Sequence, residues 1–442
     1  MKTIVKNLFI VWAIAFPSIA ISQRSLSLQE AVQTAIDHNP ELRASQLEIQ
    51  NSTQQKVIAR SALLPVVQAS AQVNHYFQLN PFFGFGETVM SDKIPYGRFG
   101  GEDQLTTVIS AVQPIFNPQA FPGIKQAGFR YEEAKLKADA KRSSTVLLVK
   151  QFYLQTLLLN ERIELQNESF KRNERVLQDS RVLFLQGKGL RVDTLRAYTA
   201  VKNLEPVLIK LKFARETSKL NLKTLIGVDS VEDFQLSDSL FLVDNTSIPS
   251  EDEVNNAARS RNPEYRLFEL QNRISEQQVA IASAARMPTV ALVGQYQLLS
   301  QTNNFDYAKA YYPSASFVGL QLSVPIFNGL SNHAKVKQAN LTKTETALHV
   351  NYAYDQLRAS VHQVVANSLE TKIRVETTAA VEETAKLSYG ITEYRYKRGV
   401  SSRLELADAS LELSTAQSNF IEAVYDYLIA RIALQHLMGN YE

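Results

Sequence analysis

One feature restricts the possible folds of this sequence more than any other: it contains two copies of one unit. The pattern Ser-x-x-Glu followed by Asn-Pro-Glu occurs at residues 27–41 and again at 250–264, an offset of 223 residues. Residues 125–227 then align without a gap with residues 337–439, at an offset of 212. Such a tandem duplication predicts two similar halves that repeat the same order of helices and strands.

The first half covers residues 23–247, including a linker at 228–247, and the second half covers residues 248–442. Each half begins with local signals for helices. Ser-x-x-Glu is a capping box, and Asn-Pro-Glu supplies an N-cap, a proline in the first turn and a favourable acid. We therefore expect helices over 27–64 and 250–287, each interrupted at its Asn-Pro.

After these helices the period of the apolar residues changes to two, which is typical of strands. We expect one strand pair in each half, at 66–77 and 104–113 and at 289–299 and 315–325. Alternate side chains point to opposite faces of a sheet, so these strands have an apolar and a polar face. The apolar face is expected to carry Val67, Ala69, Ala71, Val73, Val290 and Leu292, and the polar face Gln68, Ser70, Gln72, Gln295 and Gln297.

The remainder of each half, 119–227 and 330–439, predicts a long helical hairpin. The strongest helix breakers in these stretches are Gly187, Gly189 and Gly399, where we expect the hairpins to turn. Roughly sixty helical residues reach about 90 Å, more than a globular domain of this size accommodates. The hairpins are therefore expected to project from the strands.

The second hairpin carries a sustained apolar seam with alternating spacings of three and four, as in a coiled coil. The first hairpin keeps this phase less well: it lapses at Arg215 and Ser218 and contains Pro206, which predicts a local kink or break. The seam of the second hairpin consists of Leu406, Ala409, Leu413, Ala416, Phe420, Ala423, Tyr427, Ala430, Leu434 and Leu437.

Residues 1–22 have the basic start, short apolar run and small final residues of a secretory signal peptide, and we expect cleavage after Ser22. The alternative is a membrane anchor, but the apolar run is about nine residues and a spanning helix needs roughly twenty. The sequence has no cysteine, which excludes a lipidated N-terminal cysteine, disulfides and thiolate chemistry.

Composition argues against several other functions. The formal net charge is +3, and removal of Lys2 and Lys6 with the leader lowers it to +1. No basic run or basic-aromatic patch stands out, so the sequence offers no electrostatic site for nucleic acid. The six histidines are scattered without metal-ligand spacing, and no catalytic motif occurs. We therefore expect no enzyme activity, no cofactor and no metal site.

After the leader no apolar stretch approaches the roughly eighteen residues of a transmembrane helix. If the chain enters a membrane, a closed β-barrel is the remaining structure that satisfies its own backbone in lipid. A soluble β-sandwich alternates in the same way, and the strands alone do not distinguish it from a barrel. Four strands are too few for a barrel, because single-chain examples begin at about eight, so a barrel requires further copies.

In this order of elements the sequence resembles the outer-membrane efflux protein family, the TolC-like channels. The resemblance covers nearly the whole mature chain, including Pro-Ile-Phe-Asn after each strand pair and Tyr396-x-x-Gly399 before 404–409. It implies a mixed α/β membrane protein, a homotrimer in which four strands per chain share one β-barrel, continued by an antiparallel α-helical coiled-coil barrel. It also implies an outer-membrane location, contact with lipid, extension into the periplasm, and two partners, a periplasmic adaptor and an inner-membrane pump of RND or ABC type.

The resemblance also implies a gate at the periplasmic turns. Asp193, Glu405 and Asp408 match acids that line the constriction in this family, and Tyr396 matches a tyrosine of the bond network that keeps it closed. The alternative is that the acids form an ordinary solvated helix face. One family arginine is replaced by Ser401, and either of two neighbouring arginines, Arg398 or Arg403, is a candidate to replace it.

The expected function is therefore a trimeric outer-membrane channel-tunnel, the passive exit duct of a tripartite efflux pump or type I secretion system. A structural envelope protein or adhesin with a coiled-coil stalk is the alternative, although it gives no reason for strand pairs with polar inner faces. A periplasmic adaptor is less favoured, because it normally has one hairpin and no tandem duplication.

Overall fold

The computed structural model describes four stretches of the chain, residues 24–83, 96–228, 234–240 and 247–441. The leader expected at residues 1–22 lies outside them, as does part of the linker expected at 228–247. None of the helices in these stretches has a segment whose length and hydropathy would suit a membrane span.

The chain divides into two compact units. Unit 1 contains the two helical turns, and unit 2 contains the main β-sheet. Unit 1 comprises Met1–Asn39, Thr145–Thr246 and Thr371–Ile429, and unit 2 comprises Pro40–Ser144, Ser247–Glu370 and Ala430–Glu442.

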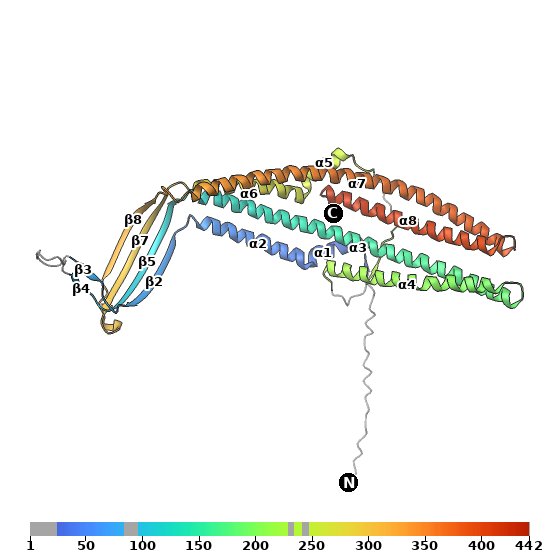
Figure 1. The fold of residues 1–442 in the computed structure, drawn as a ribbon, viewed down its shortest axis with the longest axis horizontal. Helices are drawn as coiled ribbons and strands as arrows, with labels where there is room; N and C mark the ends of the chain where they lie inside the picture. Colours follow the sequence, from blue (N-terminus) through green and yellow to red (C-terminus); the bar gives the residue numbers. More distant parts are fainter. Residues whose placement is uncertain (1–23, 84–95, 229–233, 241–246, 442) are drawn as a thin grey trace, which may run out of the picture. The chain divides into compact units, whose positions relative to one another are not determined.

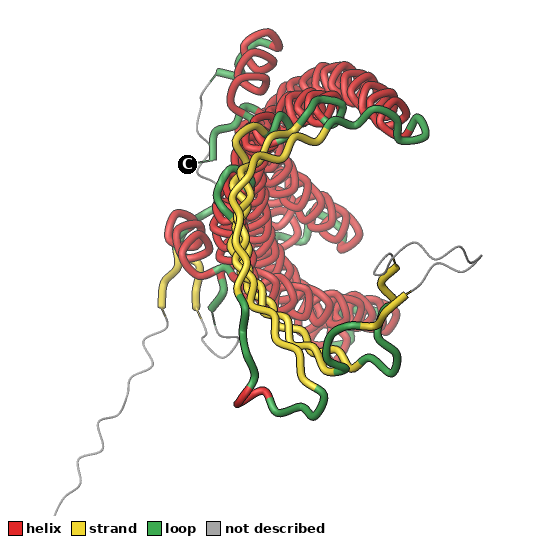
Figure 2. The backbone as a smooth tube through the Cα atoms, turned by 90° about the vertical axis from the view of Figure 1, so that its left-hand side faces the viewer, coloured by secondary structure: helices red, strands yellow, loops and turns green. Residues whose placement is uncertain are grey.

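The main sheet of unit 2 is antiparallel throughout, with the strand order β2-β5-β7-β8 (Figure 1). Seen from its end in Figure 2, it forms a strongly curved strip. We expected β5 to end at residue 113, but it continues to Phe116. Pro114 cannot donate a hydrogen bond to the neighbouring strand, and a bulge between Pro114 and Phe116 accommodates it. The strands are β2 (Val66–His75), β5 (Asp103–Phe116), β7 (Thr289–Thr302) and β8 (Ser314–Ser323).

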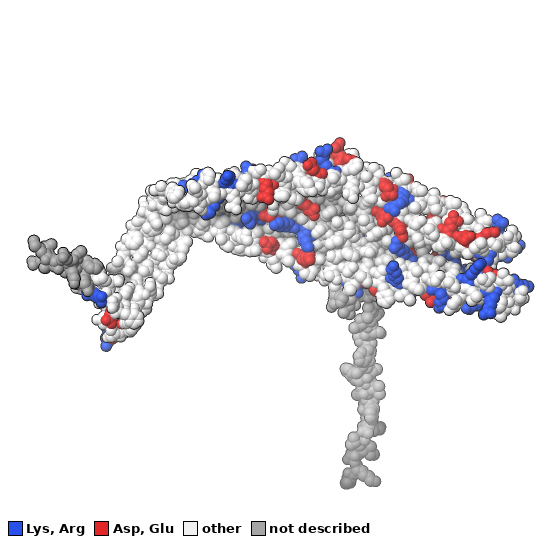
Figure 3. All heavy atoms as spheres, viewed as in Figure 1, with Lys and Arg blue, Asp and Glu red and all other residues white. Residues whose placement is uncertain are grey.

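These four strands contain a single charged residue, Asp103, and Figure 3 shows their surface almost without blue or red atoms. Asp103 is 1% exposed and lies at the loop end of the sheet. Its Oδ1 is 2.6 Å from Nδ1 of His75, and its Oδ2 accepts the backbone amide of Phe305 at 3.2 Å. The adjoining loops carry a short antiparallel pair, β3 (Pro81–Phe83) and β4 (Tyr96–Arg98), and a 3-10 turn, η1 (Tyr307–Lys309).

Each strand pair is preceded by two helices that meet at Asn-Pro, as expected. The capping boxes are confirmed: Ser27 with Glu30, and Ser250 with Glu253, each form both reciprocal bonds. The helices are α1 (Leu28–His38), α2 (Pro40–Ser61), α5 (Glu251–Arg261) and α6 (Pro263–Ala284).

Four long helices form the two hairpins, and Figure 1 shows α3 running beside α4 and α7 beside α8. The predicted seam of the second hairpin is confirmed, since all of its residues are buried except Phe420 and Leu437, which are half-buried. The helices are α3 (Ala120–Leu185), α4 (Arg191–Ile226), α7 (Ser331–Lys397) and α8 (Arg403–Leu437).

Pro206 does not break α4, which contradicts the expected break. The helix is held on both sides of the proline, because Val201 before it and Leu222 after it are buried. Pro206 itself is exposed, so water can satisfy the carbonyl that loses its helical donor. The polar position Ser218 is also accommodated: it is buried, and its hydroxyl lies 2.8 Å from that of Thr156 on α3.

Each Asn-Pro-Glu segment lies against the end of a hairpin helix, where α4 and α8 close with Leu-x-Gly at residues 225–227 and 437–439. The Asn39 side chain donates to the carbonyl of Leu225 at the end of α4 (2.7 Å), and Asn262 donates to Leu437 at the end of α8 (3.2 Å). A helix end leaves its last carbonyls without intrahelical partners, so each asparagine satisfies one of them. The same contact, an asparagine side chain bonded to a carbonyl at a helix end, therefore occurs once in unit 1 and once in unit 2.

Unit 1 also contains a short parallel pair, β1 (Arg24–Leu26) and β6 (Phe234–Leu236). Tyr153 of α3 is fully buried beneath it. Its hydroxyl lies 2.8 Å from both the Leu26 carbonyl and an Asp238 carboxylate oxygen, and burial raises the pKa of this phenol. This contact attaches the start of the described chain to the hairpin of α3 and α4.

Candidate functional site

The two helical turns have the same backbone geometry. Gly187 and Gly399 both have φ of +73°, a conformation that costs a non-glycine residue energy. In each turn the glycine amide bonds to the carbonyl three residues earlier, and the next amide bonds five residues back. These are the two bonds of a Schellman motif, which ends a helix cleanly. Gly189 has a different role: a Cβ there would lie 3.1 Å from the Phe184 backbone.

The helices that leave the turns begin differently. At α8 the Ser402 hydroxyl accepts the amide of Glu405 at 3.2 Å, a side-chain N-cap that we did not predict. At α4 the N-cap is Leu190, which has no side-chain bond to offer. Asp193 and Glu405, 212 residues apart, both lie in the first turn of their helices, where the helix dipole favours an acid.

Arg403 joins the two hairpins. Its Nη1 lies 3.0 Å from Oδ1 of Asp193 and also contacts the Asp193 backbone carbonyl. The side chains are 20% and 34% exposed, respectively. Arg398, the other candidate for the missing arginine, lies instead over the ring of Tyr394, 5.3 Å from its centroid. Within one chain, therefore, Arg403 makes the link between the hairpins.

The other predicted gate residues do not meet within a single chain. Glu405 and Asp408 are exposed on α8, with no ion pair recorded for either in the described part of the chain. Tyr396 is half-buried in the last turn of α7, and its hydroxyl has no hydrogen-bond partner among the described residues. If these residues act together, they require partners outside this single chain.

Further polar contacts hold α8 in place along its length. Two arginines at repeat-related positions, 212 residues apart, reach successive turns of α8, and another arginine reaches a serine closer to the turns. Sequence reasoning missed these residues because arginine on a long helix is most often solvated. The contacts are Arg162 with Glu422, Arg374 with Asp426 at 2.8 Å, and Arg172 with Ser414 at 3.0 Å.

The strand register brings the five predicted polar-face residues to one face of the sheet. Gln68 is opposite Ser110, which is opposite Gln295 on the next strand. Two residues further along β2, Ser70 pairs with Val108, which in turn pairs with Gln297. Directly paired residues lie on the same face, so Gln72, two positions from Ser70 on β2, joins them.

The opposite face of the sheet is apolar. The same register aligns Ala69 with Ile109 and Tyr296, and Leu292 with Leu320. Val318, Leu320 and Leu322 of β8 lie on this face and are 65% to 76% exposed within one chain. A contiguous exposed apolar surface of this kind normally contacts a partner or a membrane.

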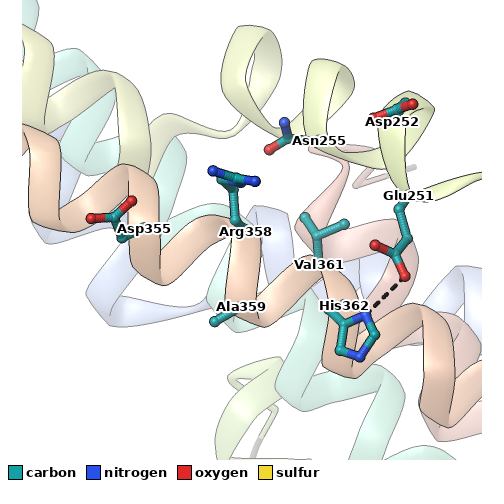
Figure 4. Close-up of a pocket in the computed structure, with 8 residues that line it drawn as sticks. All are labelled: Glu251, Asp252, Asn255, Asp355, Arg358, Ala359, Val361 and His362. Atoms are coloured by element: carbon teal, nitrogen blue, oxygen red, sulfur yellow. Dashed lines mark hydrogen bonds and ion pairs between the residues drawn. The ribbon is translucent and has the colours of Figure 1, made fainter.

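Unit 2 also has a shallow polar cavity of about 480 Å³ between α5 and α7. Figure 4 shows its side chains, among which His362 Nδ1 meets Glu251 Oε1 at 2.9 Å. Figure 4 draws no interaction from Asp252 or Asp355 to either of these residues. In the described ranges no three acidic or histidine side chains are placed to hold a metal ion.

Comparison with known proteins finds matches that cover both repeats of the chain. The sequence model of the outer membrane efflux protein family matches residues 31–228 and 254–440. The alkaline protease secretion protein AprF of Pseudomonas aeruginosa is 23% identical over 94% of this chain and 85% of its own length. The outer membrane protein TolC of Vibrio cholerae is 21% identical over 94% of this chain and 91% of its own.

Among solved structures, the CmeC outer membrane channel of Campylobacter jejuni superposes with a TM-score of 0.78 at 16% identity, covering 93% of this chain and 85% of that one. The agreement of fold extends over the strands as well as the helices, because nearly the whole chain is covered. Together with the match to both repeats, this identifies the chain as a member of the outer membrane efflux protein family.

Proposed function

We propose that this chain is an outer-membrane channel that serves as the passive exit duct of a tripartite efflux pump or a type I secretion system. Family membership supports the proposal, and so do the relatives, which are named for protease secretion and for efflux. The observation that carries it is the four-stranded sheet, which has one polar and one apolar face and almost no charge.

The two faces fit lipid on one side and water on the other. Side chains such as Ala69, Leu292 and Leu320 would contact hydrocarbon. A polar group in their place would cost several kcal/mol of free energy. Gln68, Ser70, Gln72, Gln295 and Gln297 would line a water-filled lumen, where amides keep their hydration and do not bind a passing solute strongly.

The edges of the sheet support assembly from several copies. β2 and β8 are its outer strands, and each has one side without a ladder partner in the described part of the chain. Unpaired strand edges are unstable in lipid because their backbone groups have no water to bond. Pairing β8 of one copy with β2 of the next removes every edge, and in a homotrimer this yields a twelve-stranded barrel.

The helical hairpins would continue this barrel into the periplasm as a coiled-coil tunnel, and the turns would form its gate. In a trimer Asp193, Glu405 and Asp408 would each occur three times around one opening, which favours cations. The Arg403–Asp193 ion pair would hold the second hairpin against the first in the closed state. Opening would then require this pair to break while the coiled coil repacks.

The chain would depend on partners for energy and connection. The sequence contains no catalytic motif, and we propose that an inner-membrane pump of RND or ABC type drives transport. A periplasmic adaptor would join that pump to the helical end. We propose an outer-membrane location, integral through the barrel and without a lipid anchor, since the chain has no cysteine.

Single-channel recording tests the proposed function. Purified protein added to a planar lipid bilayer should produce discrete conductance steps, and its mass in detergent should correspond to three chains. A structural stalk protein would associate without conducting. Absence of steps from protein that is trimeric and folded by circular dichroism would contradict the proposal.

A further inference from the structure

A cavity of about 700 Å³ lies between the two hairpins of unit 1, close to the helical turns. Its walls come from α3, α4 and α8, with one side chain, Tyr389, from α7. Its volume falls within the range of about 300–1,000 Å³ that is typical of sites for small organic molecules. Glu405 and Asp408, two acids of the proposed gate, do not line this cavity.

Small residues on the facing helices explain the cavity. Ala197 and Ala200 of α4 face Ala407 and Ser410 of α8, and their side chains are too short to fill the space between the helices. Longer apolar residues, Val176, Leu204 and Leu411, form its walls. The interior is thus suited to an apolar group larger than a single side chain.

The charged residues of the cavity are unequal in number. Three guanidinium groups, those of Arg172, Arg196 and Arg403, line it together with one carboxylate, that of Asp193. Asp193 is already paired with Arg403. Arg172 is 3.6 Å from a carboxylate outside the cavity, that of Glu168, so Arg196 supplies the excess positive charge.

These two arginines have unused hydrogen-bonding capacity. Arg172 donates from Nη2 to Ser414 at 3.0 Å and lies 3.6 Å from a Glu168 oxygen, but its buried Nε has no hydrogen-bond partner. Arg196 is exposed and makes no ion pair or side-chain hydrogen bond among the described residues. The missing partner costs free energy only at the buried Arg172 Nε, whereas Arg196 is exposed and its whole guanidinium group is free to bind a ligand.

We propose that this cavity binds a small organic anion with an apolar body, such as an aryl carboxylate. Guanidinium groups present paired N–H donors that match the two oxygens of a carboxylate. Arg172 and Arg196 would bind the carboxylate, and the leucine walls would contact the apolar body. The inference stands independently of the duct function, because binding to a single chain requires no pore.

Calorimetry with a matched pair of probes tests the charge requirement. The full chain, held in nanodiscs of zwitterionic lipid, is titrated with biphenyl-4-carboxylate and separately with biphenyl-4-carboxamide. The two probes have nearly the same shape, but the amide is neutral. We expect saturable binding of the carboxylate with one site per chain, at least about tenfold tighter than the amide, since charge-assisted bonds are the stronger ones.

Three substitutions test the location. Arg196→Gln should weaken carboxylate binding about tenfold, and because Arg196 has no recorded native partner it removes no fold contact. Ala407→Trp should abolish binding by filling the cavity while leaving every charge in place. Arg181→Gln, an exposed arginine of the same helix as Arg172 and outside the cavity, is the matched control and should bind as the wild type does.

Several results would overturn the proposal. Equal affinity for the carboxylate and the amide would show that the arginines do not contribute to binding. Binding that survives Ala407→Trp would place the probe elsewhere on the protein. No saturable binding by folded wild-type protein would mean that the cavity is closed, for instance by a neighbouring subunit or a partner helix, and does not accept a small anion.

Discussion

Arg403 and Asp193 form an ion pair that has no counterpart at the repeat-related positions. The equivalents at an offset of 212 are Arg191 and Glu405, so both α4 and α8 begin with an arginine followed two residues later by an acid. Arg403 nevertheless reaches Asp193 at 3.0 Å, whereas no pair between Arg191 and Glu405 is recorded in the described part of the chain. The two hairpins therefore differ in contacts although they agree in sequence pattern.

The first prediction concerns this pair. Arg403→Gln and Asp193→Asn should each favour the open gate, and the double variant should be no more open than either single one. A partly exposed pair contributes about 0.2–1 kcal/mol, which corresponds to about a 1.4- to 5-fold change in the open-to-closed ratio per subunit. Open probability in single-channel recordings measures it. Arg191→Gln is the matched control, and an equal effect there would show that the pair has no specific role.

The second prediction concerns the exposed acids. Glu405→Ala with Asp408→Ala should reduce cation selectivity, because a ring of negative potential is lost while helix propensity is retained or improved. The reversal potential under a salt gradient reports this directly. Glu412→Ala, exposed on the same helix, should leave it unchanged. A wild-type reversal potential in the double variant would identify these acids as an ordinary solvated helix face.

The third prediction concerns the faces of the sheet. Arginine at Ala69 or Leu292 would face lipid and cost roughly 2–4 kcal/mol at the midplane. Arginine at Gln72 or Gln295 would face water and should be tolerated. Assembly is measured as the fraction of heat-resistant oligomer in outer-membrane extracts. If all four variants assemble equally badly, the proposed orientation of the two faces is wrong.

The fourth prediction concerns Asn262, whose Nδ2 donates to the Leu437 carbonyl and whose Oδ1 accepts the Glu264 amide at 2.9 Å. Asn262→Asp keeps the acceptor, and hence the N-cap of α6, but places a carboxylate against a carbonyl at the end of α8. A buried lost bond of this kind costs about 1–3 kcal/mol. Thermal unfolding followed by circular dichroism should show the loss, whereas Asn256→Asp, exposed on α5, should not.

The fifth prediction concerns the pH dependence of stability through His436. Burial lowers the pKa of this imidazole, which outweighs the opposing effect of Glu264, and its Nδ1 lies 2.8 Å from the Ser143 hydroxyl. A folded-state pKa below the unfolded value means that the unfolded chain binds protons more readily. Stability is therefore greatest above about pH 6.5 and falls as the pH decreases below it.

Replacement of His436 tests this dependence. His436→Gln should flatten the fall of the unfolding temperature between pH 7 and pH 5, because the titrating group is gone while a polar side chain remains. His349→Gln is the control, since His349 is 66% exposed. An unchanged pH profile in the His436 variant would assign the acid sensitivity to other groups.

Much of the local structure was predictable because its causes lie within a few residues. The capping boxes at Ser27 and Ser250 require two side chains three residues apart, and their hydrogen bonds are present. The seam from Leu406 to Leu434 has a fixed spacing, and its residues are buried or half-buried as that spacing predicts. Pro206 shows the limit of local rules, because packing at Val201 and Leu222 holds a helix that the proline alone would break.

The sequence by itself determined the order of elements, the positions of the turns and the two faces of each strand, since these depend on short-range spacing and on steric properties of single residues. The tertiary structure decided which side chains meet across long separations. Nothing in the spacing distinguishes Arg403 from Arg398, or from its repeat equivalent Arg191, as the partner of Asp193. That choice depends on how the two hairpins pack against each other, which side chains far apart in the sequence decide together.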